Sequence, residues 1–235
     1  MKKISLLLLL ALATAPFSRA ADFFSTEPSE DLFTFGVRLG INTSNRTVSL
    51  DNDFGYNVQG WGTGFDFGAV ADINIRDYIS IQPGLYFESR SNTYTFIQPY
   101  LVSGGDEEHA IQAGTFNSYS LVIPVLANIH FNITDDVRWN VAAGPYVAFK
   151  LGSKLKNKVN LNTNFLEGRP LPGNEFIEKP AGCDFGLKLG TGIEVFRRYS
   201  LNIEYMAGMR HAWQNKLTDY GGRTKAWVFT LGYSF

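Results

Sequence analysis

Large apolar side chains occupy alternate positions in eight segments of the chain, and a period of two is the geometry of a β-strand. In each segment the odd-numbered residues form the apolar face. The segments are Leu32–Asn42, Gly64–Asn74, Tyr78–Arg90, Ser118–Phe131, Val137–Leu151, Asp184–Val195, Ser200–Arg210 and Ala226–Phe235. The pattern therefore predicts eight strands, each with one apolar face.

The even-numbered face of these segments is polar. No Asp, Glu, Lys or Arg falls on an odd-numbered position within the eight segments. The charged residues of the even-numbered face are Arg38, Asp66, Asp72, Glu88, Arg90, Arg138, Lys150, Asp184, Lys188, Glu194, Glu204 and Arg210. Most of the glycines also lie on this face, which suits a narrow interior, and aromatic residues gather near the ends of the apolar faces. We therefore expect charges inside a barrel and apolar side chains against lipid, between two aromatic belts.

The connections between the predicted strands alternate between short and long. Those around 75–77, 132–136 and 196–199 are short, and those at 43–63, 91–117, 152–183 and 211–225 are longer. Bacterial outer-membrane barrels have short periplasmic turns and long extracellular loops. The sequence thus predicts an all-β fold, an eight-stranded antiparallel up-and-down transmembrane β-barrel with both termini periplasmic. The alternative, a soluble β-sandwich, gives no reason for such sorting.

The first residues predict export. Lys2 and Lys3 precede an apolar stretch of about 12 residues, too short to span a membrane as a helix. Small residues at Ser18 and Ala20 predict a signal peptide over 1–20, a short periplasmic lead over 21–31 and an outer-membrane barrel domain over 32–235. Cleavage leaves 18 of the 21 basic residues against 22 acidic ones, a net charge near −4, which disfavours nucleic acid as a partner.

Short glycine-centred motifs carry a family resemblance. They are Phe35 to Asn42 (FGVRLGIN), Ser120 to Pro124 (SLVIP), Ala143 to Tyr146 (AGPY), Asp184 to Leu187 (DFGL), Gly190 to Glu194 (GTGIE) and Leu231 to Phe235 (LGYSF). Across nearly the whole mature chain they resemble the PorT-like outer-membrane β-barrel family of the Bacteroidetes type, which implies a Gram-negative cell envelope. Members similar to this chain include a component associated with protein secretion. The resemblance supplies no catalytic residues.

Candidate chemistry is sparse, and we expect no catalytic residue, no cofactor and no metal site. The bore of an eight-stranded barrel is filled by side chains, so the balanced charges predict a plugged lumen of ion pairs. His130 should point into the periplasmic end of that lumen. None of His109, His130 and His211 shows a recognisable pairing with a serine. The run from Asp106 to His109 lacks the spacing of a calcium loop, and Cys183 is an unpaired thiol by default.

These observations favour a non-enzymatic integral outer-membrane barrel that presents four long extracellular loops for adhesion, partner docking or envelope integrity. Two alternatives stay open: a transport-related barrel, either a small-solute path or an accessory to a protein secretion system, and a lipid-modifying enzyme at the rim. The expected partners are outer-membrane lipid, lipopolysaccharide contacted by Lys154, Lys156 and Lys158, and envelope or secretion-system proteins.

Overall fold

A computed structural model describes residues 23–47, 56–101, 107–161, 182–211 and 223–235. The predicted signal peptide lies outside this part of the chain. Eight strands follow one another in the described residues. They are β1 (Phe33–Thr47), β2 (Tyr56–Arg76), β3 (Ile79–Leu101), β4 (Glu107–Asn132), β5 (Val137–Leu161), β6 (Cys183–Val195), β7 (Tyr199–His211) and β8 (Arg223–Ser234).

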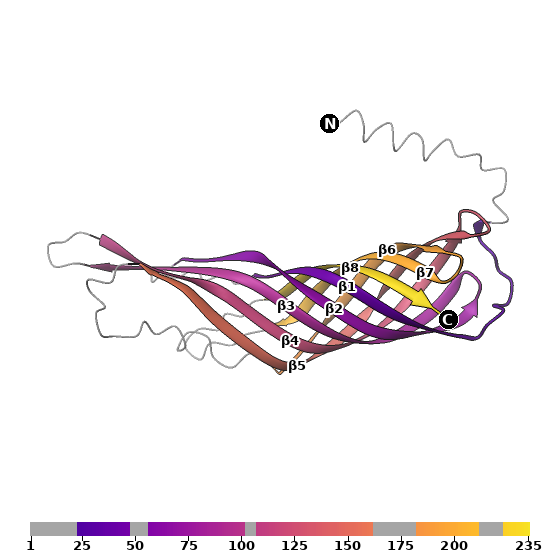
Figure 1. Cartoon of the computed structure of the whole chain (residues 1–235), viewed down its shortest axis with the longest axis horizontal. Coiled ribbons are helices and arrows are strands. Elements are labelled where there is room, and N and C mark those ends of the chain that lie inside the picture. Colours follow the sequence, from indigo (N-terminus) through magenta and orange to yellow (C-terminus); the bar gives the residue numbers. More distant parts are fainter. Residues whose placement is uncertain (1–22, 48–55, 102–106, 162–181, 212–222) are drawn as a thin grey trace, which may run out of the picture.

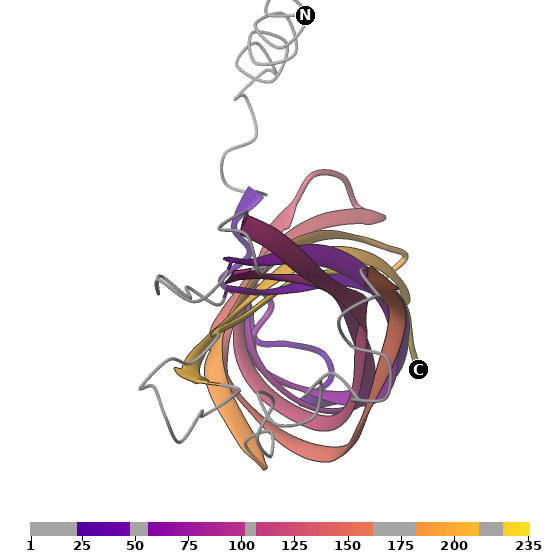
Figure 2. The ribbon, with the colours of Figure 1, turned by 90° about the vertical axis from the view of Figure 1, so that its left-hand side faces the viewer.

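The sheet closes on itself. Every strand pairs antiparallel with its neighbours in the sequence, and β1 pairs with both β2 and β8. Leu39 of β1, for example, lies opposite Phe67 of β2 and opposite Leu231 of β8. Figure 2 shows the resulting ring of strands. The predicted fold, an antiparallel up-and-down barrel of eight strands, is confirmed.

The two faces of the barrel follow the predicted parity. On β4, Val125 points outward with 44% of its surface exposed, whereas Val122 points inward and is 0% exposed. The same division holds for the charges, since Asp66, Glu88 and Lys188 are all buried inside. In a lipid bilayer this exposed apolar band is favourable, because its side chains contact hydrocarbon and not water.

At one end of the barrel, several strands are longer than the sequence predicted. Residues 91–117 were expected to form one long connection, but 91–101 continue β3 and 107–117 belong to β4. The expected connections 43–63, 152–183 and 211–225 likewise contain strand residues of β1, β2, β5 and β8. Figure 1 shows β2 to β5 reaching well past β6, β7 and β8. The prediction failed for β3 and β4 because polar and apolar residues do not alternate regularly in their outer parts.

The opposite end carries the short turns, so we call it the short-turn end. Aromatic side chains cluster around the barrel there, including Phe131 and Trp139, whose ring centroids are 4.9 Å apart. Residues 23–32 pack against this end: Phe24 lies 5.0 Å from Phe131 and 5.3 Å from Tyr78, ring centroid to ring centroid. The backbone N–H of Asp77 also donates to the carbonyl of Glu27. The predicted lead is thus an ordered cover of the short-turn end from residue 23 onward.

Within the described residues, no helix has the length and apolar character needed to cross a membrane.

Candidate functional site

An apolar cluster fills the middle of the lumen. Val122, Tyr146 and Met206 are almost completely buried there, and Tyr86 and Val228 pack in the same cluster. These side chains come from β3, β4, β5, β7 and β8, so they meet from all around the barrel. The interior of an eight-stranded barrel is just wide enough for side chains of this kind to fill it.

Buried ion pairs flank the apolar cluster. The Lys188 Nζ atom lies 2.8 Å from Glu204 Oε2, and the same ammonium stands 4.8 Å from the centre of the Tyr86 ring. Arg90 Nη2 lies 2.5 Å from Glu88 Oε2, and it also contacts the sulfur of Met206 at 3.1 Å. A buried charge without a partner costs several kcal/mol, so within each pair one charge offsets the cost of burying the other. The predicted internal network of ion pairs is confirmed.

A second network ties the turns together at the short-turn end. Arg138 Nη2 of β5 lies 2.7 Å from Glu194 Oε1 of β6, and its Nη1 lies 3.4 Å from Asp77 Oδ1. Arg197, in the turn between β6 and β7, reaches the same Asp77 oxygen at 3.1 Å. Asp77 therefore joins two arginines from different hairpins, and this end of the barrel is fixed by charge as well as by backbone pairing.

The turn between β6 and β7 is strained. Phe196 and Arg197 both have φ of 55°, and the N–H of Arg198 donates to the carbonyl of Val195 at 3.1 Å. Positive φ at both central residues is the type I′ hairpin turn, which normally favours Asn and Gly. The β4–β5 turn and β8 hold this turn in place, since the N–H of Phe196 donates to the carbonyl of Asp136 and the carbonyl of Arg198 accepts from the N–H of Ser234. Such strain persists only where the surroundings fix it, and it is common at functional sites.

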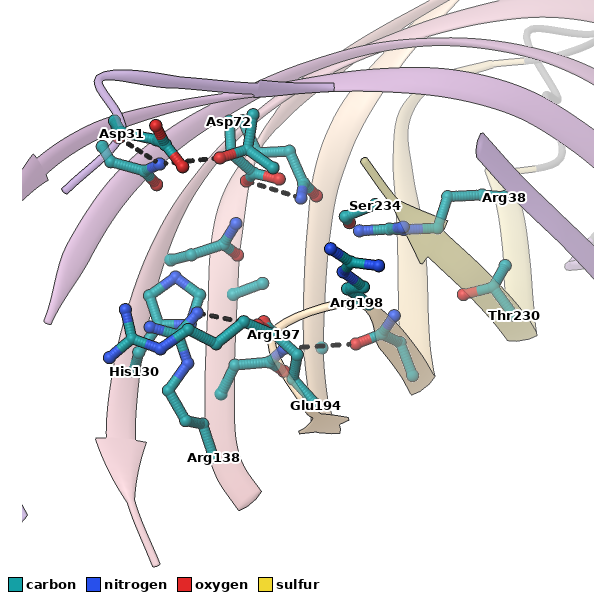
Figure 3. Close-up of a pocket in the computed structure, with 18 of the residues that line it drawn as sticks. Asp31, Arg38, Asp72, His130, Arg138, Glu194, Arg197, Arg198, Thr230 and Ser234 are labelled. Atoms are coloured by element: carbon teal, nitrogen blue, oxygen red, sulfur yellow. Dashed lines mark hydrogen bonds and ion pairs between the residues drawn. The ribbon is translucent and has the colours of Figure 1, made fainter. Parts of the chain in front are cut away.

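A polar cavity of about 220 Å³ lies inside the short-turn end (Figure 3). Its walls come from all eight strands, from the lead and from the β2–β3 and β6–β7 turns. The basic residues that line it are Arg38, Arg138, Arg197 and Arg198, and the acidic residues are Glu30, Asp31, Asp72, Asp77, Glu194 and Glu204. In Figure 3, Arg38, Arg198 and Ser234 lie together on one side, whereas Asp31 and Asp72 lie on the other. This cavity is the candidate site of the molecule.

His130 lines the cavity and is buried, as expected for a residue at this end of the lumen. Its Nε2 atom lies 3.1 Å from Ser80 Oγ, which is a serine–histidine contact that the sequence did not reveal. Nucleophilic catalysis needs a reachable hydroxyl and a third group that orients the histidine. Ser80 is completely buried and does not line the cavity, and the Nδ1 atom of His130 has no hydrogen-bond partner. This contact therefore lacks both the reachable hydroxyl and the orienting group.

The other candidate residues lie elsewhere. Lys154 is exposed on β5 at the end opposite the short turns, and Cys183 is a half-buried free thiol at the start of β6. The side chains of His109, His211, Lys156 and Lys158 fall outside the described part, as does residue 106. Among the described residues, no group of three or more His, Cys, Asp or Glu side chains is placed to hold a metal ion.

The sequence reading missed two sets of residues. The first is the apolar lumen cluster, whose members Tyr86, Val122, Tyr146, Met206 and Val228 are large apolar residues at even-numbered positions; these departures from strict alternation were the available signal. The second set, in the cavity, lies in the turns and the lead. An up-and-down order brings these segments to one end, but it does not show which side chains meet.

Several solved structures are similar to this one. The structure is similar to Ail, the attachment invasion locus protein of Yersinia pestis, solved with the heparin analogue sucrose octasulfate (14% identity, 87% of this chain and 100% of that one, TM-score 0.39). It is also similar to Neisserial surface protein A (14%, 86% and 97%, TM-score 0.42) and to OprG of Pseudomonas aeruginosa (10%, 90% and 98%, TM-score 0.42). No curated protein matches the sequence.

A family model provides the assignment. The model described as "Outer membrane protein beta-barrel domain" matches residues 22–213, most of the chain. That span includes the lead and seven of the strands in the closed barrel. The chain therefore belongs to the outer membrane protein beta-barrel domain family, and its place is the outer membrane.

Proposed function

We propose that this protein is a non-enzymatic outer-membrane barrel that holds an extended sheet outside the cell as a platform for adhesion or partner docking. The observation that carries the proposal is the length of β2 to β5 (Figure 1). Phe149 is the last residue of β5 that pairs with β6, and it lies opposite Leu121 of β4. Beyond that level β4 continues from Ser120 to Glu107, about 45 Å of strand at ~3.3 Å per residue.

The projecting sheet has two edges. On one side β2 pairs with β1 only as far as Gly62, opposite Ser44, although β2 extends to Tyr56. On the other side β5 extends to Leu161, well past its pairing with β6. Within the described residues, the outer parts of β2 and β5 therefore offer backbone N–H and C=O groups to an added strand. An extended peptide that pairs with such an edge gains main-chain hydrogen bonds without needing a deep pocket.

The platform requires that the short turns and both termini face the periplasm, which we include in the proposal. The short-long order of the connections supports this orientation. The proposal also includes the PorT-like family, which the glycine-centred motifs support. Lipopolysaccharide is the lipid that we expect next to exposed Lys154. The buried ion pairs of the lumen support a structural barrel over an enzyme, because among the described residues of the cavity they leave no reachable nucleophile beside a base.

Shortening the β3–β4 hairpin tests the platform. Tyr94 and Gly114 lie opposite one another, so replacing residues 95–113 with Asn-Gly creates a two-residue hairpin and leaves the barrel intact. Gram-negative cells that carry the full-length protein should adhere to immobilised fibronectin, collagen or heparin, or aggregate with one another, and cells with the shortened hairpin should lose this gain. Heat-modifiable migration on a gel serves as the control for folding. Full activity of the shortened protein, or no gain from the full-length protein in any assay, would contradict the proposal.

Labelling of single cysteines tests the orientation. In a Cys183→Ser background, Gly104→Cys lies between β3 and β4, and Asp135→Cys lies in the short turn between β4 and β5. A membrane-impermeant maleimide should label position 104 on intact cells and position 135 only after the outer membrane is permeabilised. The reverse pattern would place the projecting sheet in the periplasm and end the platform proposal.

A further inference from the structure

One arginine of the cavity is buried without an acidic partner. Arg38 of β1 is 8% exposed and lines the cavity. Its guanidinium donates one long hydrogen bond, 3.4 Å from Nη1 to the carbonyl oxygen of Val37. Among the described residues, no carboxylate oxygen lies within 4.0 Å of its guanidinium, in contrast to Arg90 and Arg138. The other N–H groups of Arg38 face the cavity, where an anion is the acceptor that suits a guanidinium best.

Two glycines make room for this guanidinium. A Cβ atom on Gly36 would lie 3.1 Å from Arg38 Nη1 and 3.1 Å from Ser234 Oγ, which places the guanidinium and the hydroxyl side by side. A Cβ atom on Gly232 would collide with the same Nη1. The bare backbone of β1 and β8 thus forms a cradle that holds Arg38 and leaves Ser234 next to it. A cradle of this kind fixes where the donors point.

A second arginine approaches the same place from the strained turn. Arg198 follows Phe196 and Arg197, the two residues with positive φ, and its backbone carbonyl accepts from the N–H of Ser234 at 2.7 Å. In Figure 3 the side chains of Arg198 and Arg38 lie on the same side of the cavity, next to Ser234. Arg197 is paired with Asp77, whereas no ion pair joins Arg198 to a carboxylate of the described residues. The turn therefore presents one paired arginine and one unpaired one.

We infer that Arg38, Arg198 and Ser234 form a binding site for a small oxyanion, a carboxylate or a phosphate, inside the short-turn end of the barrel. The planar fork of arginine donates two parallel hydrogen bonds to such groups, and a serine hydroxyl adds a third donor. At about 220 Å³ the cavity is below the ~300–1,000 Å³ of pockets for drug-sized ligands. The ligand is therefore small. This inference does not rest on the proposed function, which concerns the other end of the barrel.

The acidic residues of the cavity do not occupy this site. Glu194 and Asp77 are paired with Arg138 and Arg197, and Glu204 is paired with Lys188. Asp72, on the neighbouring strand β2, lies opposite Thr34 of β1 and accepts a hydrogen bond of 2.7 Å from Gln82, and no ion pair of the described residues joins it to Arg38. Glu30 and Asp31 are exposed on the lead, where water screens their charge. The oxyanion thus meets two unpaired cations on its own side of the cavity.

Titration of the purified full-length barrel in detergent tests the site. Inorganic phosphate and acetate are added separately at constant ionic strength, and backbone amide shifts are followed by nuclear magnetic resonance. We expect saturable shifts near Arg38 and Ser234 with at least one of the two anions, and the tighter binder identifies the preferred class. Arg198→Gln should weaken that binding about tenfold, the loss expected for one hydrogen bond between charged groups. Arg198 is exposed, so this variant is expected to fold.

The matched control is Arg223→Gln, because Arg223 is an equally exposed arginine at the far end of β8. It should bind the anion as the unchanged protein does. Arg38→Gln should abolish saturable binding, with heat-modifiable migration showing whether it folds. The inference is overturned if neither anion gives shifts beyond those of sodium chloride, or if Arg198→Gln and Arg223→Gln bind alike.

Discussion

Breaking a deeply buried ion pair provides a quantitative test of the filled lumen. Lys188 is 1% exposed and Glu204 is 7% exposed, and their charged atoms lie 2.8 Å apart. Lys188→Met keeps an unbranched apolar side chain of similar length but leaves Glu204 buried without its cation. Removing one member of a buried pair costs ~3–5 kcal/mol of unfolding free energy. The lost contact with the Tyr86 ring adds about 1 kcal/mol.

The double variant, Lys188→Met with Glu204→Gln, should recover much of that loss. Replacing both charges of a buried pair is often close to neutral, because neither desolvation cost remains. We therefore expect the two changes to be non-additive by ~2–3 kcal/mol, the upper range for residues in contact. Arg197→Gln is the matched control: Arg197 is 48% exposed in its pair with Asp77, and surface pairs contribute about 1 kcal/mol or less.

The assay is equilibrium unfolding in urea of the protein refolded into phospholipid vesicles, followed by tryptophan fluorescence. The unfolding free energies of the unchanged protein, the two single variants, the double variant and Arg197→Gln are compared. If Lys188→Met costs no more than Arg197→Gln, the lumen around Lys188 is wet and the reasoning is wrong. Strict additivity of the two single changes would equally refute a direct pair.

Two further changes test the faces of the barrel and its glycines. Val125→Arg places a charge in the middle of the outward apolar face and should lower the unfolding free energy in vesicles by ~2–4 kcal/mol. Leu151→Arg, near the far end of the apolar band of β5, should lower it by ~1 kcal/mol or less. Equal losses would mean that the bilayer is not where the apolar band lies. Gly144→Ala drives its Cβ against the backbone carbonyl of Val125 and should lower the unfolding free energy by ~1–3 kcal/mol. Gly152→Ala meets nothing within 4 Å and should be neutral in the same assay. A neutral Gly144→Ala would show that the strands can shift to accept the added methyl group.

The closed barrel was predictable because lipid imposes a strict alternation. From Phe33 to Ile41 and from Tyr119 to Phe131 every outward position must suit hydrocarbon, so the parity of the sequence shows both the strands and their faces. Beyond the apolar band that constraint ends. Residues 94–101 and 107–113 pair as strands, yet polar and apolar residues do not alternate regularly there. The projecting sheet was therefore mistaken for connections, although its residues are strand.

The candidate site was much less accessible to sequence reasoning. Parity placed Arg38, Arg138 and Glu194 inside the lumen, and the order of the strands placed the turns at one end. Whether Arg138 pairs with Glu194, and whether Arg38 is left over, depends on the register of neighbouring strands, which sets Arg138 opposite Glu194. The position of Arg198 depends on a turn whose positive φ values occur at Phe196 and Arg197, residue types that seldom adopt them.

Single-channel recording tests the central claim, that the lumen is closed by its own side chains. The purified protein, reconstituted in a planar lipid bilayer, should insert without a steady conductance above the baseline, because Val122, Tyr146, Met206 and the Lys188–Glu204 pair fill the bore. A stable open level that rises with salt concentration would contradict the account, since ions would then pass where the structure places packed side chains.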